Sequence, residues 1–313
     1  MSGHGAGPAT AQRVLRLGTR KSLMATTQSG LVAHRLTELT GRQIELVGVT
    51  TFGDVTRAHL AQLGGTGVFV SALREKLLHG EIDFAVHSLK DLPTKPDPDV
   101  VIAAIPPRDD PRDALVGPAG LADLPAGARV GTGSPRRVAQ LRLLRPDIEY
   151  VAIRGNADTR IGKVTSGELD AVVLAAAGLG RIGREAEIAQ LFEVADMLPA
   201  PGQGALAVEC RADDAAMIEL LAVLDDPRTR AAVAAERAVL AALEAGCSAP
   251  VGAYAADDGH ILNLTATVVA LDGARSVRKS TAGDPAAAME LGRDLATAMI
   301  AEGAGTLMGE RTH

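Results

Sequence analysis

The feature that most constrains this chain is a weak internal duplication. A short apolar run ending in Gly-Thr occurs at 14–22 and again at 128–134, and each is followed by residues that begin a helix. The segments at 80–86 and 167–173 also match, and each reads as a helix end at Gly followed by a buried strand. This alternation predicts two α/β lobes, each with a parallel sheet covered by helices on both faces.

Two Pro-rich segments indicate where the chain passes between the lobes. The stretch 106–111 contains three prolines and predicts a hinge. A second stretch, 198–204, is rich in Pro and Gly and precedes an apolar strand at 205–209. We expect that strand to return the chain to the first lobe.

The last third of the chain has a different pattern, which predicts a small α+β domain. Asp226 and Pro227 begin a strong helix, and Gly246 suits the left-handed position after its end. The expected elements are a helix over 228–245, strands over 261–271 and 274–280 joined by an Asp-Gly turn, and a helix over 285–302. The predicted division is 12–108 with 200–222 for the first lobe, 109–199 for the second lobe and 223–313 for the third domain.

Charge and aromatic content argue against a nucleic-acid-binding protein. The net charge is -6, and aromatic residues make up only 2% of the 313 residues. A general nucleic-acid binder would be basic and would carry aromatic stacking platforms. We therefore expect a local anionic ligand wherever arginines gather.

The cysteines and the N-terminal sequence favour a cytoplasmic protein. Cys210 and Cys247 have neither metal-ligand spacing nor a disulfide framework, so we expect no metal and a reducing compartment. Residues 1–11 lack the charged and apolar regions of a signal peptide, and we expect them to form a disordered tail. No apolar run reaches transmembrane length, so we expect no membrane partner.

Arginines recur at strand ends and helix starts in both halves. They are Arg20, Arg136, Arg137, Arg154, Arg160 and Arg181. Ligands of open parallel sheets bind beyond the carboxyl ends of the strands, where helix N-termini already favour anions. Arginine adds bidentate recognition of carboxylates. The group predicts a ligand with several carboxylates or phosphates, although any one of these residues is explained equally well as surface charge.

The residues His87 to Asp91 follow the buried strand 82–86 and are candidates for catalysis. Asp91 could stabilise a cation or transfer a proton. A turn aspartate before Leu92-Pro93 accounts for it equally well. His87 is expected to be structural.

Cys247 follows a helix C-terminus, whose negative dipole end does not lower a thiol pKa. It therefore does not resemble an activated nucleophile, although it could still be an attachment point. Cys210, at the end of the strand 205–209, is expected in the core.

Two glycine-rich segments suggest nucleotide sites but lack the required context. Residues 178–183 match G-x-G-x-x-G, but the next segment is too short for a helix and a second strand before the prolines at 199 and 201. The 64–67 segment lacks the Gly-Lys-Ser/Thr of a P-loop, and we expect a mobile loop there.

Together these residues resemble the hydroxymethylbilane synthase (porphobilinogen deaminase) family, from about Val14 into the third domain. The matching stretches are GTRKS at 18–22, GGTGVFV at 64–70, AVHSLKDLP at 85–93, DPRD at 110–113, GTGSPRR at 131–137, RGN at 154–156 with Arg160, PGQG at 201–204 and LEAGC at 243–247. The resemblance implies three domains, the first two shaped like the type II periplasmic-binding fold.

The resemblance also implies a reaction and a cofactor. Four porphobilinogens condense head to tail with loss of four ammonias, and water releases hydroxymethylbilane. A dipyrromethane primer is implied in thioether linkage to Cys247, with Asp91 beside the pyrrole nitrogens as the catalytic carboxylate. The implied cofactor-binding residues are Asp91, Lys90, Ser134, Arg136, Arg137, Arg154 and Arg160. The implied substrate-binding residues are Arg20, Ser22, Arg154, Arg160, Arg181, Phe69 and Gln203. A monomer is also implied.

The chain departs from the family pattern at three places. Leu23 stands where a proline is frequent, and Gln62 and Thr66 stand where some members carry lysines. The 64–67 segment therefore lacks two positive charges, which puts in doubt an electrostatic grip on substrate by that loop.

Two alternative functions remain open from the sequence. One is a non-catalytic two-lobed anion-binding protein, which would need neither Cys247 nor Asp91. The other is a nicotinamide oxidoreductase using 178–183, for which we predict no measurable NAD binding.

Overall fold

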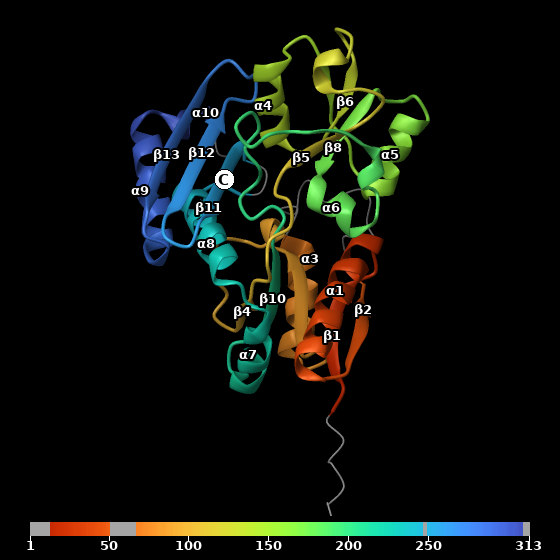
Figure 1. The fold of residues 1–313 in the computed structure, drawn as a ribbon, viewed down its shortest axis with the longest axis vertical. Helices are drawn as coiled ribbons and strands as arrows, with labels where there is room; N and C mark the ends of the chain where they lie inside the picture. Colours follow the sequence, from red (N-terminus) through yellow and green to blue (C-terminus); the bar gives the residue numbers. More distant parts are fainter. Residues whose placement is uncertain (1–12, 51–66, 247–248, 309–313) are drawn as a thin grey trace, which may run out of the picture.

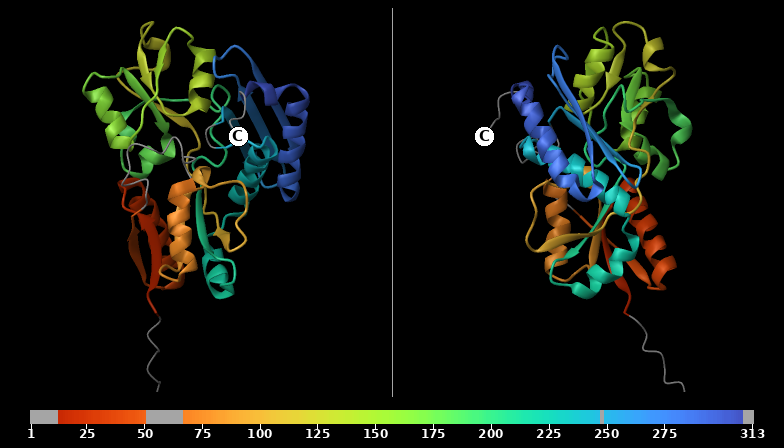
Figure 2. Two further views of the ribbon diagram at one scale, coloured as in Figure 1. Left: turned by 180° about the vertical axis from the view of Figure 1, so that it is seen from behind. Right: turned by 60° about the vertical axis from the view of Figure 1, so that its left-hand side comes forward.

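The computed structural model describes residues 13–50, 67–246 and 249–308. Two α/β lobes lie one above the other, and a third domain packs beside them (Figure 1). The views from behind and from the side show the same three bodies (Figure 2). The overall class is therefore the α/β arrangement with a small α+β domain that the sequence predicts.

The first lobe contains a five-stranded sheet in the order β2-β1-β3-β10-β4. Its strands are β1 (Leu15–Arg20), β2 (Ile44–Val49), β3 (Phe84–Ser88), β4 (Val100–Ala104) and β10 (Leu206–Arg211). Its helices are α1 (Leu23–Thr40), α3 (Gly67–Leu78) and α7 (Ala215–Leu221), with the 3₁₀ turns η1 (Leu89–Asp91) and η4 (Ala222–Leu224).

The second lobe repeats this plan with the order β7-β6-β8-β5-β9. Its strands are β5 (Asp113–Val116), β6 (Arg129–Gly131), β7 (Glu149–Val151), β8 (Ala171–Ala175) and β9 (Ile188–Leu191). Its helices are α4 (Pro135–Leu144), α5 (Ala157–Thr165) and α6 (Ala176–Arg181), with the turns η2 (Leu121–Asp123) and η3 (Glu185–Glu187). The sequence duplication therefore corresponds to a duplicated sheet topology.

Neither sheet is fully parallel, which corrects the sequence prediction. β10 runs antiparallel to β3 and β4, and β5 runs antiparallel to β8 and β9. Leu206 at the start of β10 pairs with Ser88 at the end of β3, and Asp113 at the start of β5 pairs with Ala175 at the end of β8. Each crossing strand therefore enters its sheet at the carboxyl ends of the parallel strands, and from there it can only run in the opposite direction.

The two segments that cross between the lobes touch one another. The Asp109 amide donates to the Gly204 carbonyl at 3.3 Å. Gly204 has φ of +88°, and a Cβ at this position would lie 2.5 Å from the Asp109 carbonyl oxygen. Only glycine permits both this backbone conformation and this close approach.

The third domain is a three-stranded antiparallel sheet, in the order β11-β12-β13, packed on helices. Its elements are α8 (Pro227–Ala242), β11 (Val251–Asp257), β12 (Leu262–Val269), β13 (Ser276–Gly283), η5 (Pro285–Ala287), α9 (Ala288–Ala301) and α10 (Ala304–Leu307). The sequence pattern does not predict β11, because its glycine and three alanines are residue types that are depleted in strands.

The end of α8 also differs from the prediction. The helix ends at Ala242, and the left-handed residue is Glu244, with φ of 50°, rather than Gly246. The Ala245 amide closes the turn by donating to the Leu240 carbonyl at 3.0 Å. The chain therefore turns away from the helix axis at Glu244, two residues before Gly246.

Two further sequence expectations concern burial and membranes. Cys210 is fully buried in the core of the first lobe, as predicted, and burial raises the pKa of its thiol to about 11. Within residues 13–50, 67–246 and 249–308, no helix has the length and apolar character of a membrane span.

Candidate active site

Lys90 and Asp91 lie on η1, directly after the carboxyl end of β3. Leu89 fixes this turn, since its side chain is fully buried and its amide donates to the Ala205 carbonyl of the crossing segment at 3.0 Å. Asp91 is exposed and Lys90 is half-buried. Among the described residues, the Asp91 carboxylate accepts no hydrogen bond and forms no ion pair. It is therefore available to a ligand.

The Lys90 ammonium is surrounded by charged groups from both lobes. Burial lowers the pKa of Lys90 to about 8, Asp91 and Asp113 act to raise it, and Arg137 and Arg136 act to lower it. The Lys90 Nζ donates to the Gln203 Oε1 at 3.2 Å. A cation whose pKa is lowered by burial gains most from an added carboxylate.

Arg136 and Arg137 lie in the first turn of α4, which begins shortly after β6. Both residues therefore lie near the carboxyl end of β6, at one edge of the second lobe's sheet. They are only 3% and 6% exposed. The Asp113 Oδ2 lies 2.7 Å from Arg136 Nη1, and the Asp113 Oδ1 lies 2.7 Å from Arg137 Nη2. Burial alone would raise the pKa of Asp113, but the two guanidinium groups outweigh it and hold that pKa well below its ordinary value.

Two further arginines of the second lobe, Arg160 and Arg181, are half-buried. Burial lowers the pKa of both Arg160 and Arg181. The Arg160 Nε donates only to a carbonyl, that of Gly155, at 2.8 Å. Arg181 is 7% exposed and pairs with Asp109, so it is partly neutralised. Arg154, at the end of the loop after β7, is exposed.

Of the remaining predicted residues, Ser22 and Ser134 stand at helix starts, Arg20 at a strand end and Gln203 in the second crossing segment. Ser22 is the N-cap of α1, and its hydroxyl accepts from the Ala25 amide at 3.4 Å. Arg20 ends β1 and is half-buried. Ser134 is the N-cap of α4 and makes no side-chain capping bond, so its hydroxyl is available. Gln203 is 1% exposed, with both ends of its amide engaged inside the protein.

Several predicted residues lie outside the described part of the chain. They are Cys247, Gln62 and the loop through Thr66; Phe69 falls within α3, but its side chain is also outside the described set. The structure therefore does not place the predicted attachment cysteine.

The cluster fits a ligand with several carboxylates. The Arg136 Nε is buried and has no hydrogen-bond partner among the described residues. A buried donor left unpaired is costly, so an acceptor from a ligand would stabilise it. The cluster of Lys90, Arg136, Arg137 and Arg160 contains four cations against one buried carboxylate, Asp113. In the same described ranges, no group of three His, Cys, Asp or Glu side chains is arranged to hold a metal ion.

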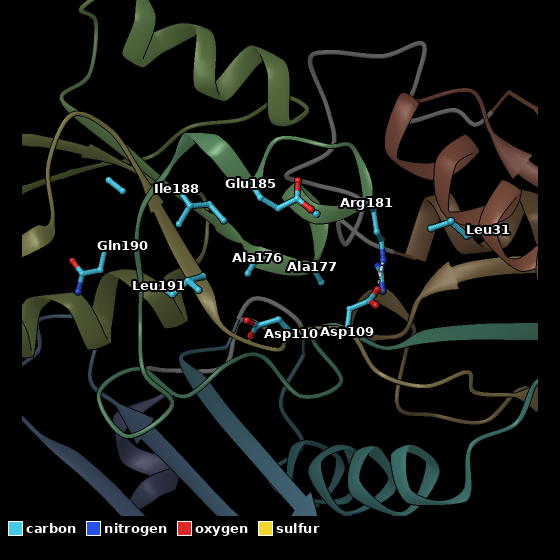
Figure 3. Close-up of a pocket in the computed structure, with 12 residues that line it drawn as sticks. Leu31, Asp109, Asp110, Ala176, Ala177, Arg181, Glu185, Ile188, Gln190 and Leu191 are labelled. Atoms are coloured by element: carbon cyan, nitrogen blue, oxygen red, sulfur yellow. Dashed lines mark hydrogen bonds and ion pairs between the residues drawn. The ribbon is translucent and has the colours of Figure 1, made fainter.

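The structure also contains a cavity of about 780 Å³ (Figure 3). Arg181, Asp109, Asp110, Ala176, Ala177 and Leu191 are among the residues that line it, and Leu31 of the first lobe closes one side. Its lining includes neither Lys90, Asp91 nor Arg136. The charge cluster, rather than this cavity, therefore defines the candidate site.

Asp113 belongs to the site although the sequence pattern does not identify it. It is the last residue of the Asp-Pro-Arg-Asp motif at 110–113. The only signal available was an acidic residue at the start of a very apolar strand, whose side chain is then 0% exposed. Such a carboxylate requires a charged partner.

His87 is structural, as expected. Its Nε2 lies 3.2 Å from the Glu209 Oε2, and Arg74 Nη2 lies 2.7 Å from the Glu209 Oε1. Gly178 and Gly180 lie inside α6, a helix of six residues, so the G-x-G-x-x-G match does not form a phosphate-binding turn.

Comparisons with known proteins cover nearly the whole chain. A family profile described as "Porphobilinogen deaminase, dipyromethane cofactor binding domain" matches residues 15–219, and "Porphobilinogen deaminase, C-terminal domain" matches residues 230–301. Porphobilinogen deaminase 1 of Streptomyces coelicolor is 59% identical over 96% of this chain and 99% of its own length. Porphobilinogen deaminase of Thermobifida fusca is 60% identical over 94% and 96%.

Solved structures with a similar arrangement include periplasmic binding proteins. The methionine binding protein MetQ aligns with a TM-score of 0.44 and 12% identity, over 67% of this chain and 89% of its own. A periplasmic substrate-binding protein of an ABC transporter from Coxiella burnetii aligns with a TM-score of 0.43 and 13% identity, over 72% and 97%. Because both TM-scores are below 0.5, we describe the two lobes by their own strand orders and not by these similarities.

Proposed function

The chain belongs to the porphobilinogen deaminase family, and from this premise we propose how its residues divide the work of a hydroxymethylbilane synthase. The enzyme is a transferase that condenses four porphobilinogen molecules head to tail, releases four ammonia molecules and, by hydrolysis, yields the linear tetrapyrrole hydroxymethylbilane. Its cofactor is a dipyrromethane. The observation that carries the residue assignment is the four-cation cluster beside the unpaired Asp91 carboxylate.

Buried and half-buried cations from both lobes would hold the carboxylates of the dipyrromethane. Lys90, Arg136, Arg137 and Arg160 are the candidates from the structure, with Arg154 and Ser134 nearby on the loops that precede α5 and α4. When bound, this group would supply the free pyrrole carbon onto which the first porphobilinogen is added. The attachment point is proposed to be Cys247, which comes shortly after the turn at Glu244.

Asp91 is proposed as the catalytic carboxylate. It is exposed and unpaired among the described residues, and it adjoins Lys90, so a ligand held by the cations would lie beside it. A fixed carboxylate stabilises the cation that develops on porphobilinogen as its ammonia leaves. It could also hold the pyrrole N–H through hydrogen bonds, which would orient the ring.

Substrate carboxylates are proposed to bind at Arg20, Ser22, Arg154, Arg160 and Arg181, with Phe69 and Gln203 nearby. Burial of Arg160 and Arg181 supports this role, because it strengthens their interaction with an anion. We further propose a monomeric cytoplasmic enzyme without nucleic-acid or membrane partners. The net charge of -6 and the absence of disulfide spacing in the sequence support that proposal.

The experiment that tests the proposal is the denatured intact mass of freshly purified protein. We expect an excess equal to two porphobilinogens less two ammonias. The excess should be absent in Cys247→Ala and retained in the matched control Cys210→Ala, whose thiol is buried in the core. If the wild-type protein has the bare polypeptide mass and gains neither mass nor activity on incubation with porphobilinogen, the proposal is wrong and an anion-binding protein is favoured.

A further inference from the structure

A continuous chain of polar contacts runs from η1 of the first lobe to α4 of the second. It starts at the Lys90 Nζ, which donates to the Gln203 Oε1 at 3.2 Å. The Gln203 Nε2 then donates to the Asp113 Oδ1 at 2.9 Å. Asp113 finally pairs with Arg137 and Arg136 at 2.7 Å each. Gln203, which is uncharged, and Asp113, which is anionic, thus connect Lys90 of the first lobe to the two arginines of the second lobe.

Gln203 is built into this chain rather than open to a ligand. Its side chain is 1% exposed. Its oxygen accepts from Lys90, and its nitrogen donates both to the Pro111 carbonyl at 2.8 Å and to Asp113. All the polar atoms of the amide are therefore engaged, and the protein itself fixes which end is oxygen and which is nitrogen.

Asp113 is likewise buried, with its carboxylate paired inside the protein. It is 0% exposed, its Oδ1 accepts hydrogen bonds from Arg137 and Gln203, and its Oδ2 forms an ion pair with the Arg136 Nη1 at 2.7 Å. Because it lies at the first position of β5, directly after the crossing segment, its backbone is fixed by pairing with Ala175. A buried carboxylate with these partners holds both guanidinium groups in one orientation, which leaves the Arg136 Nε without a partner among the described residues.

We infer that Asp113 and Gln203 are positioning residues that together fix Lys90, Arg136 and Arg137 as one cross-lobe binding unit. Gln203 therefore acts through Lys90 instead of contacting substrate. Asp113 orients the arginines, and its negative charge reduces the repulsion among Lys90, Arg136 and Arg137. The inference deepens the proposed function and rests on it, because the three cations are assigned to the cofactor there.

The lowered pKa of Lys90 agrees with this arrangement. Burial, Arg137 and Arg136 lower it, while Asp91 and Asp113 raise it. These four charged groups come from η1, β5 and α4, so the electrostatic environment of Lys90 depends on both lobes. A change at Gln203 alters none of these charges, which makes it the cleaner test of positioning.

The experiment is a double-mutant cycle in the full-length enzyme with Gln203→Met and Lys90→Met. We expect Gln203→Met to keep the covalent primer mass and to lower kcat/KM about tenfold, since contacting polar pairs couple strongly. In the Lys90→Met background, the same change should alter kcat/KM and the fraction carrying primer by less than about twofold. Additive effects of the two changes on kcat/KM would overturn the inference.

A second pair of variants tests Asp113 without relying on turnover. Asp113→Asn should lower the fraction of protein carrying the primer mass, because Arg136 and Arg137 lose their common partner. Asp110→Asn is the matched control: Asp110 lies in the same Asp-Pro-Arg-Asp segment, pairs with Arg112 and has no contact with the cluster. Equal primer fractions in Asp113→Asn and Asp110→Asn would contradict the role of Asp113. If Asp113→Asn does not fold, the Gln203 cycle decides.

These results separate the inference from the proposed function. A wild-type protein that never acquires primer mass would refute the function itself. A wild-type protein with primer mass, but with additive Gln203 and Lys90 effects, would refute the inference alone.

Discussion

Arg181 of α6 and Asp109 of the first crossing segment form a close ion pair. The Arg181 Nε donates to the Asp109 Oδ2 at 2.8 Å, and the Arg181 Nη2 lies 2.7 Å from the same oxygen. The Nη2 also donates to the Gly204 carbonyl at 2.6 Å. One side chain of the second lobe is thus fastened to both segments that join the lobes, while its charge borders the cavity in Figure 3.

We predict that Asp109→Ala weakens substrate binding more than it slows chemistry. Without Asp109, Arg181 keeps only the Gly204 carbonyl and loses its fixed orientation. Because Asp109 is half exposed, the effect should be modest, about fivefold in KM with a smaller change in kcat. Steady-state kinetics check this. In an Arg181→Ala background, Asp109→Ala should change nothing further, and a fivefold effect remaining there would disprove the coupling.

Asp91→Ala should leave a folded protein whose turnover is reduced by orders of magnitude. The residue is exposed and unpaired among the described residues, so its removal costs little stability, whereas it takes away the carboxylate that stabilises the developing cation. Rapid-quench turnover and thermal unfolding should be measured on the same preparation. Near-normal turnover in a variant of wild-type stability would show that Asp91 is not the catalytic group.

Lys90→Arg should abolish an alkaline loss of binding. Burial lowers the pKa of Lys90 to about 8, so its ammonium is progressively lost as the pH rises through 8, whereas a guanidinium stays charged. In the primer-free Cys247→Ala background, the dissociation constant for porphobilinogen should rise above pH 8 with lysine and stay level with arginine. Titration calorimetry from pH 6.5 to 9.5 measures it, and a level profile with lysine would contradict the prediction.

Glu209→Gln should destabilise the first lobe in a pH-dependent way. Burial would raise the pKa of Glu209, but His87 and Arg74 lower it from 4.5 to about 2. A lowered folded-state pKa contributes stability that is complete above about pH 4.5 and is lost as the pH falls towards 2. The free energy of unfolding of the variant should therefore be lower than that of the wild type by roughly 3 kcal/mol near neutral pH.

The measurement for Glu209 is urea unfolding of both proteins across this pH range. The difference in unfolding free energy should shrink below about pH 4.5 and be small near pH 2. A difference that does not change with pH would mean that lost packing, rather than charge pairing, explains the effect.

The sequence itself carried the local information. Apolar runs ending in Gly-Thr predicted β1 and β6, and they placed Arg136 and Arg137 at the start of the following helix. Arg20 instead ends β1, because Gly18 and Thr19 continue the strand and pair with β2 rather than form a turn. Periodicity also predicted α8, β12 and β13 to within a few residues. These features depend on contacts between near neighbours in the chain, so a pattern in the sequence is enough to reveal them.

Only the tertiary structure decided which distant residues meet. The antiparallel direction of β5 and β10 follows from where the crossing segments enter each sheet, which no local pattern records. The contact of Gln203 with Lys90 spans 113 residues, and that with Asp113 spans 90. The sequence determined which chemical groups this protein carries to the edges of its sheets. Their pairing, and hence the burial and charge that each group experiences, arises only when the two lobes and the crossing segments pack together.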